Sequence, residues 1–123
     1  MSMRQDELLA YMEGLDVVST HSHHEYHAFH RGITLEKLLR VTYPGWQAGY
    51  GGEPGGVGRM FDTLAGNNAF YWLCAALGKL YGDGSPMNLE NWREIGEALK
   101  ARYEAEPRHH EKIMTDVCRL KWV

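Results

Sequence analysis

Histidines at alternate positions are the feature of this sequence with the clearest chemical potential. Five of the seven histidines lie between residues 21 and 30, and one residue separates His21 from His23. In an extended strand, side chains two positions apart point to the same face, about 7 Å apart along the backbone. Two neutral imidazoles placed in this way can bind one divalent cation of the Zn, Fe, Ni or Cu group. The spacing therefore predicts a metal site with His21 and His23 as ligands.

Two plainer interpretations of the same histidines stay open. A solvated, histidine-rich loop would bind no metal, and an adventitious metal-binding loop would use any histidine of residues 21–30 equally well. The stretch from His24 to His27 is not an HExxH motif, because it is one residue too short. Only a true HxH site makes His21 and His23 matter more than their neighbours.

A strand is predicted to position the two histidines. Residues 15–23 begin as an apolar, β-branched run that leads directly into them, after a short amphipathic helix over residues 4–13. Residues 120–123 are again apolar and β-prone, and they predict the start of a second strand. One strand, a long helical stretch and another strand indicate an α/β fold, in which a helical crossover joins two parallel strands.

The residues between these strands, 34–118, are expected to form a helical region. A first helix is expected to end at Pro44, and the glycine-rich residues 49–58 predict a mobile loop. Two longer helices are predicted over residues 69–81 and 89–105, from their apolar spacing and the asparagines before them. The four tryptophans are expected to pack in the interior rather than to form a stacking surface.

Composition and charge argue against several classes of protein. The 123 residues carry a net charge of −3 with no basic face, so nucleic-acid binding is not expected. No apolar run approaches the roughly 18 residues of a membrane helix, and the N-terminal residues lack the order of a signal peptide. Cys74 and Cys118 are too few for a disulfide framework, and Cys74 is expected in the core rather than as a nucleophile. A cytoplasmic protein without nucleic-acid or membrane partners is expected.

One string of residues carries a resemblance to a known family. Asp-Val-Val-Ser-Thr-His-Ser-His at residues 16–23 resembles the first strand of the amidohydrolase superfamily. Residues 33–40, 68–72 and 89–92 are similar to the inserted helical region of its uronate isomerase and amidohydrolase-related branch. The resemblance implies a (β/α)₈ TIM barrel with its site at the carboxyl ends of the strands. It also implies that the two histidines bind a divalent metal ion, with Zn favoured, while the other ligands and the catalytic carboxylate come from later strands.

The same resemblance gives Arg40 a substrate-binding role. In the isomerase branch, a guanidinium at this place would pair with the carboxylate of a sugar acid, since the two groups match in bidentate geometry. The plainer interpretation of Arg40 is an exposed arginine at the end of a helix. No catalytic residue is assigned among these 123 residues.

A barrel of this kind takes about 250 residues, so residues 1–123 are expected to be a single incomplete domain, mainly helical in itself. The complete enzyme would be a metal-dependent hydrolase, or an isomerase of sugar acids, acting on a small-molecule substrate. Two histidines leave the coordination sphere unfinished, so this chain alone is expected to be inactive. The alternative is a non-enzymatic helical binding module that self-associates into a homo-oligomer.

Overall fold

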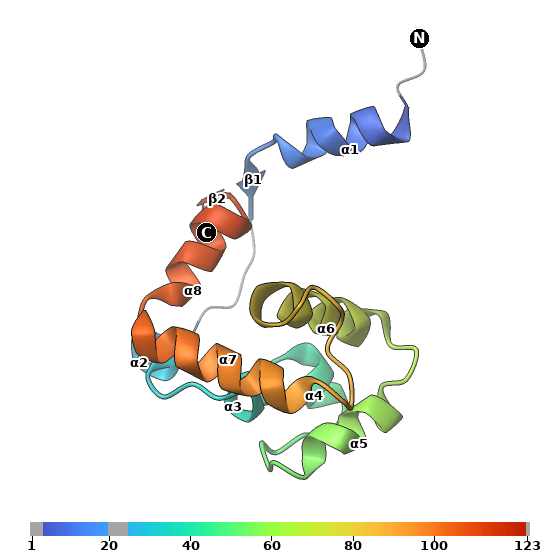
Figure 1. Cartoon of the computed structure of the whole chain (residues 1–123), viewed down its shortest axis with the longest axis vertical. Helices are drawn as coiled ribbons and strands as arrows, with labels where there is room; N and C mark the ends of the chain where they lie inside the picture. Colours follow the sequence, from blue (N-terminus) through green and yellow to red (C-terminus); the bar gives the residue numbers. More distant parts are fainter. Residues whose placement is uncertain (1–3, 20–24, 123) are drawn as a thin grey trace. The chain divides into compact units, whose positions relative to one another are not determined.

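The computed structural model describes residues 4–19 and 25–122 of the chain. Their contacts divide the chain into two compact units, unit 1 (residues 1–26 and 108–123) and unit 2 (residues 27–107). Most described residues are helical, and the described strands form one small sheet (Figure 1). The prediction of a mainly helical chain is therefore confirmed. Among the described residues, no helix is both long and apolar enough to cross a membrane.

Unit 1 contains a two-stranded parallel sheet. Its elements are α1 (Gln5–Glu13), β1 (Val17–Val18), α8 (His109–Lys112), the π-helical turn η1 (Ile113–Val117) and β2 (Leu120–Trp122). Val17 pairs with Leu120 and Val18 with Trp122, and the Val17 N–H donates to the Arg119 carbonyl at 3.1 Å. The predicted parallel pairing across a long helical crossover is confirmed. Of the strand expected over residues 15–23, the described part is shorter than predicted, because Leu15, Asp16 and Ser19 lie outside the ladder, and residues 20–23 are not among the described residues.

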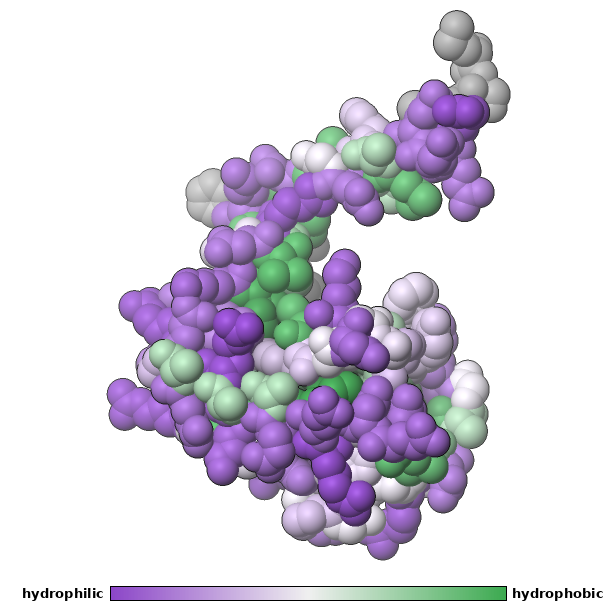
Figure 2. Space-filling view, viewed as in Figure 1, coloured by the Kyte–Doolittle hydropathy of each residue, from purple (hydrophilic) through white to green (hydrophobic). Residues whose placement is uncertain are grey.

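The N-terminal helix α1 forms where it was predicted, but its apolar side is uncovered. The Arg4 N–H donates to the Glu7 carboxylate at 3.0 Å, which satisfies one of the free N–H groups at the start of the helix. Leu9 and Met12 are 51% and 54% exposed, and no residue of α1 is buried. Figure 2 shows hydrophobic patches at the surface of this part of the chain among hydrophilic atoms. The helix is therefore held by local hydrogen bonds rather than by packing.

Unit 2 holds the hydrophobic core. Its helices are α2 (His27–His30), α3 (Leu35–Arg40), α4 (Tyr43–Gln47), α5 (Gly56–Thr63), α6 (Asn68–Tyr81) and α7 (Trp92–Ala105). Every fully buried hydrophobic residue among the described residues belongs to this unit. Leu39 from α3 and Leu99 from α7 are completely buried, and Cys74 from α6 is only 4% exposed. The prediction that Cys74 is a core residue is confirmed.

Two helix starts differ from the predictions for physical reasons. Pro44 lies in the first turn of α4, where a missing N–H costs nothing, and the Thr42 hydroxyl caps this helix by accepting from the Gly45 N–H at 3.2 Å. Helix α7 begins at Trp92 rather than at residue 89. The Asn88 side chain accepts from the N–H groups of residues 90 and 91, which closes a turn before the helix.

Two further expectations are corrected by the fold. Helix α5 begins at Gly56, so the last part of the predicted glycine-rich loop is helical. Trp46 and Trp72 are each 62% exposed, so these two tryptophans do not fill the core. Each instead lies edge-to-face against a neighbouring tyrosine, with ring centroids 5.3 Å apart.

Asn67→Ala is expected to destabilise unit 2 by about 1 kcal/mol. The Asn67 Oδ1 accepts from the Phe70 N–H at 2.9 Å at the start of α6, and its Nδ2 donates to Gln47 Oε1 at 3.1 Å. Urea denaturation of the purified chain measures the change. Asn68→Ala is the matched control, since the adjacent Asn68 is exposed and caps nothing. Equal losses for the two variants would contradict the assigned cap.

Candidate functional site

The predicted metal ligands, His21 and His23, lie outside the described residues. The elements before them are described, and β1 ends at Val18, three positions before the first histidine. Extended backbone is present at Val17 and Val18, whereas Ser19 lies outside the ladder. The metal site itself stays a prediction.

The β1–β2 sheet is exposed on both faces. Successive residues of a strand point to opposite faces, and Val17 and Val18 are 42% and 59% exposed. Lys121 of β2 and Asp16, the residue before β1, form an ion pair of 3.6 Å, but both side chains are exposed, so the pair contributes little stability. Parallel strands in proteins are normally covered on both faces. The described residues give the β1–β2 pair no such cover.

Within neither unit do three described His, Cys, Asp or Glu side chains lie close enough together to share one cation. The Cys74 thiol is buried, and this burial raises its pKa to about 11, so it is protonated at neutral pH. Its burial places it in the hydrophobic core of unit 2.

Arg40 lies in unit 2, at the C-terminal end of α3, and is exposed. It lines a cavity of about 250 Å³ together with Thr34, Glu36, Lys37, Gly51 and Gly52. A Cβ on Gly52 would lie 3.3 Å from the Arg40 Cδ, so the glycine lets the loop pass close to the arginine. The position matches the plainer interpretation, an exposed arginine at a helix end.

The charges around Arg40 decide what this cavity could bind. The Lys37 ammonium already donates to the Phe29 carbonyl and lies 4.5 Å from the centroid of the Phe29 ring. No hydrogen bond or ion pair with a described residue engages the Arg40 guanidinium, which remains open to a ligand. Glu36 in the same lining would repel a substrate carboxylate. Substrate binding by Arg40 therefore stays a prediction.

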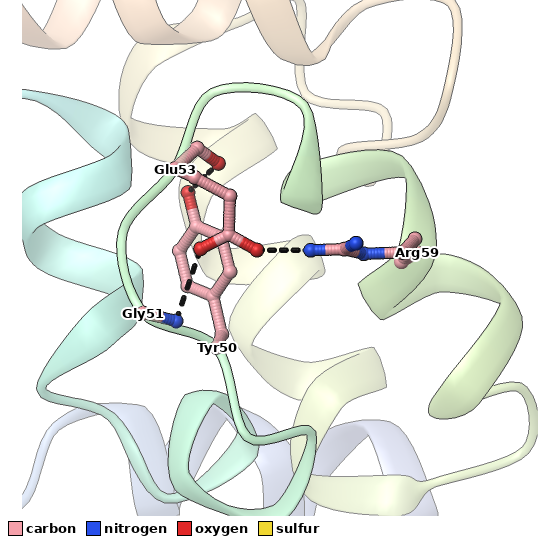
Figure 3. Close-up of polar contacts among 4 residues, drawn as sticks. All are labelled: Tyr50, Gly51, Glu53 and Arg59. Carbon is pink, nitrogen blue, oxygen red and sulfur yellow. Dashed lines mark hydrogen bonds and ion pairs between the residues drawn. The ribbon is translucent and has the colours of Figure 1, made fainter.

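Sequence reasoning missed a polar cluster that fixes the loop between α4 and α5 (Figure 3). The Glu53 carboxylate pairs with Arg59 and accepts from the Gly51 N–H at 3.2 Å, while the Tyr50 hydroxyl donates to the Glu53 carbonyl at 2.9 Å. Burial, with the charges of Glu36 and Glu53, raises the pKa of Tyr50 to about 12. The signal in the sequence was weak, because an acid and a base six positions apart lie on no common face before the loop is folded. The cluster orders the loop next to Arg40.

Glu53→Gln is expected to destabilise the loop between α4 and α5 near neutral pH. The variant should also lose the part of the loop's pH dependence that comes from protonation of the Glu53 carboxylate. Hydrogen bonding from the Glu53 backbone N–H, followed by the Arg59 charge, holds the pKa of this carboxyl below its ordinary value of 4.5. A depressed folded-state pKa stabilises the fold above the unfolded value, and this stabilisation is lost as the pH falls through the folded value. The NMR shift of the Gly51 amide proton should therefore titrate with a midpoint below 4.5.

The control for this titration is Asp62→Asn, which changes an exposed acid on α5. The Gly51 signal should keep its titration in Asp62→Asn and lose it in Glu53→Gln. A Gly51 midpoint at or above the ordinary glutamate value would show that the carboxylate is not held as described.

Comparison with known proteins gives no match for this chain among family models, curated proteins or solved structures.

Proposed function

We propose that this chain supplies the first two strands and the inserted helical region of a metal-dependent enzyme of amidohydrolase type, either a hydrolase or an isomerase of sugar acids. The observation that carries the proposal is the parallel pairing of β1 with β2 across a helical crossover. In the sequence, His21 and His23 follow the end of β1 by three and five positions. In a parallel sheet the carboxyl ends of the strands meet at one edge, where the sites of such enzymes lie.

The exposure of the sheet supports a larger assembly of strands. Val17 and Val18 leave both faces of β1 open, and a two-stranded sheet has two unpaired edges. An isolated pair of strands is marginally stable in water. In a barrel, neighbouring strands would pair with these edges, while side chains inside and helices outside would cover the faces.

The chemistry follows from the donor set. Two imidazoles suit a Zn-class cation but leave its coordination incomplete, so the remaining ligands would come from strands that the described residues do not include. When bound, the cation polarises a substrate oxygen or activates a water molecule. His21 and His23 would hold the metal through neutral ring nitrogens, and Arg40 would bind a substrate carboxylate. This chain alone would be inactive.

Metal titration by calorimetry tests the proposed ligands. With Zn²⁺, His21→Ala and His23→Ala should each weaken binding at least tenfold, whereas His24→Ala and His27→Ala should change it less than twofold. These neighbours are matched controls because they lie in the same histidine-rich stretch. Similar losses for all four variants would show an adventitious metal-binding loop. Substantial turnover of uronates or simple amides by the chain with Zn²⁺, abolished by His21→Ala, would overturn the expected inactivity.

A second candidate function, a helical binding module that self-associates, is favoured by the uncovered side of α1. Leu8, Leu9 and Met12 of α1 are each more than two-fifths exposed, as is Leu15 just after it, and a second copy of the chain would bury these side chains. Sedimentation velocity separates the candidates. A defined oligomer that Met12→Lys dissociates would support the module, whereas a monomer or a polydisperse aggregate would support the incomplete barrel.

A further inference from the structure

An apolar cavity in unit 2 shares no residue with the proposed metal site or with the surroundings of Arg40. It has a volume of about 390 Å³ and lies between the end of α5, the turn at residues 64–67, the start of α6 and the segment at residues 86–87. Small-molecule sites in proteins typically measure about 300–1,000 Å³. The cavity is large enough for an organic ligand of one or two rings.

The walls of this cavity are aromatic and sulfur-containing. Phe61 and Phe70 meet edge-to-face with centroids 5.2 Å apart, and Tyr71, Cys74 and Met87 complete the apolar lining. The Met87 N–H donates to the Cys74 carbonyl at 2.9 Å, which holds the segment after α6 against this helix. The Cys74 thiol is protonated at neutral pH and acts as an apolar wall. The aromatic rings and polarizable sulfur atoms of the lining favour a flat aromatic ligand.

The charge of the lining limits the ligand further. None of the residues that line the cavity carries a charged side chain, so an ionised ligand would lose its hydration without gaining a counter-ion. The Asn67 amide is already used by Phe70 and Gln47. The Asn68 amide, exposed at the rim, has no hydrogen bond with a described residue and can engage one polar group of a ligand.

We propose that this cavity binds an uncharged aromatic small molecule of one or two rings that carries a single hydroxyl or carbonyl group. The rings pack against Phe61, Phe70 and Met87, and the polar group hydrogen-bonds to the Asn68 amide at the rim. The proposal does not depend on the proposed enzyme function, because it rests on residues of unit 2 that the metal site does not use.

A calorimetric titration of the full chain with 2-naphthol tests the proposal. Ala65→Phe is expected to weaken binding at least fivefold, because Ala65 is an exposed residue of the lining and its enlarged side chain would fill the mouth. Ala69→Phe is the matched control, since Ala69 is an exposed alanine of α6 outside the lining, and binding should change less than twofold. An effect below fivefold in Ala65→Phe, or equal effects in both variants, would overturn the proposal.

Two further arms exclude other sources of the same signal. The anion 2-naphthoate should bind at least tenfold more weakly than 2-naphthol, and equal or tighter binding would contradict the neutral site. Met12→Lys should leave 2-naphthol binding within twofold, whereas a larger loss would place the ligand on the exposed side of α1. Circular dichroism of each variant verifies that the helices are retained.

Discussion

Gly78→Ala is expected to destabilise unit 2 by about 3 kcal/mol, the upper part of the range for overpacking a well-packed interior. An added Cβ at Gly78 would lie 1.8 Å from the Ser85 carbonyl oxygen and 2.8 Å from its carbon. These are backbone atoms, so no side-chain rotation relieves the overlap. The Gly78 carbonyl also accepts from the N–H groups of Gly82 and Gly84, which ties the end of α6 to the chain that folds back over it. Helix α6 and the segment that contains Ser85 must therefore move apart before an alanine can fit at position 78.

The matched control is Gly58→Ala, which places the same methyl group inside α5 with the opposite expected sign. The nearest atom to a Cβ at Gly58 is the Leu89 Cδ2, at the ordinary contact distance of 3.9 Å. With no overlap to relieve, the alanine variant should be more stable by about 0.5–1 kcal/mol, because glycine loses more backbone entropy in a helix. Urea denaturation followed at 222 nm measures both changes. Destabilisation of similar size in the two variants would contradict the prediction, because the loss in Gly78→Ala could then not be assigned to the overlap with the Ser85 backbone.

Local patterns in the sequence were sufficient to predict most elements and the pairing of the strands. Apolar spacing and a capping asparagine identified α6, and the β-prone residues at 17–18 and 120–122 formed the expected parallel pair. The polar contacts of Asn88, by contrast, moved the start of α7 by three residues, because side-chain hydrogen bonds to the backbone compete with the first helical turn.

A candidate site could be predicted from the sequence only where its functional residues lie close together along the chain. The alternation of His21 and His23 is visible without a structure, as is the cluster of glycines near residue 52. The pairing of Glu53 with Arg59, and the meeting of Phe61 with Met87 around one cavity, depend on how the loops fold. Because such contacts are set by tertiary packing, no periodicity in the sequence indicates them.

Backbone amides of unit 2 are expected to exchange with solvent at least about a thousandfold more slowly than those of the β1–β2 sheet in the same chain. Exchange from a buried core requires global unfolding, which costs about 5 kcal/mol or more, whereas an uncovered element opens locally. Leu39 and Leu99 are completely buried, and every fully buried hydrophobic residue that the structure describes lies in unit 2. Native-state hydrogen exchange by NMR compares the Leu99 and Val17 amides directly.

The same asymmetry predicts that residues 27–107 fold without the rest of the chain. Their excised segment should unfold cooperatively, with a urea midpoint close to that of unit 2 in the full chain, because no core residue is removed. Loss of cooperative unfolding would show that the segment depends on unit 1. Strong protection of the Val17 amide in the full chain would contradict the exposed sheet. Protection that disappeared on dilution, or in Met12→Lys, would identify a second copy of the chain as the cover and favour the binding module over the incomplete barrel.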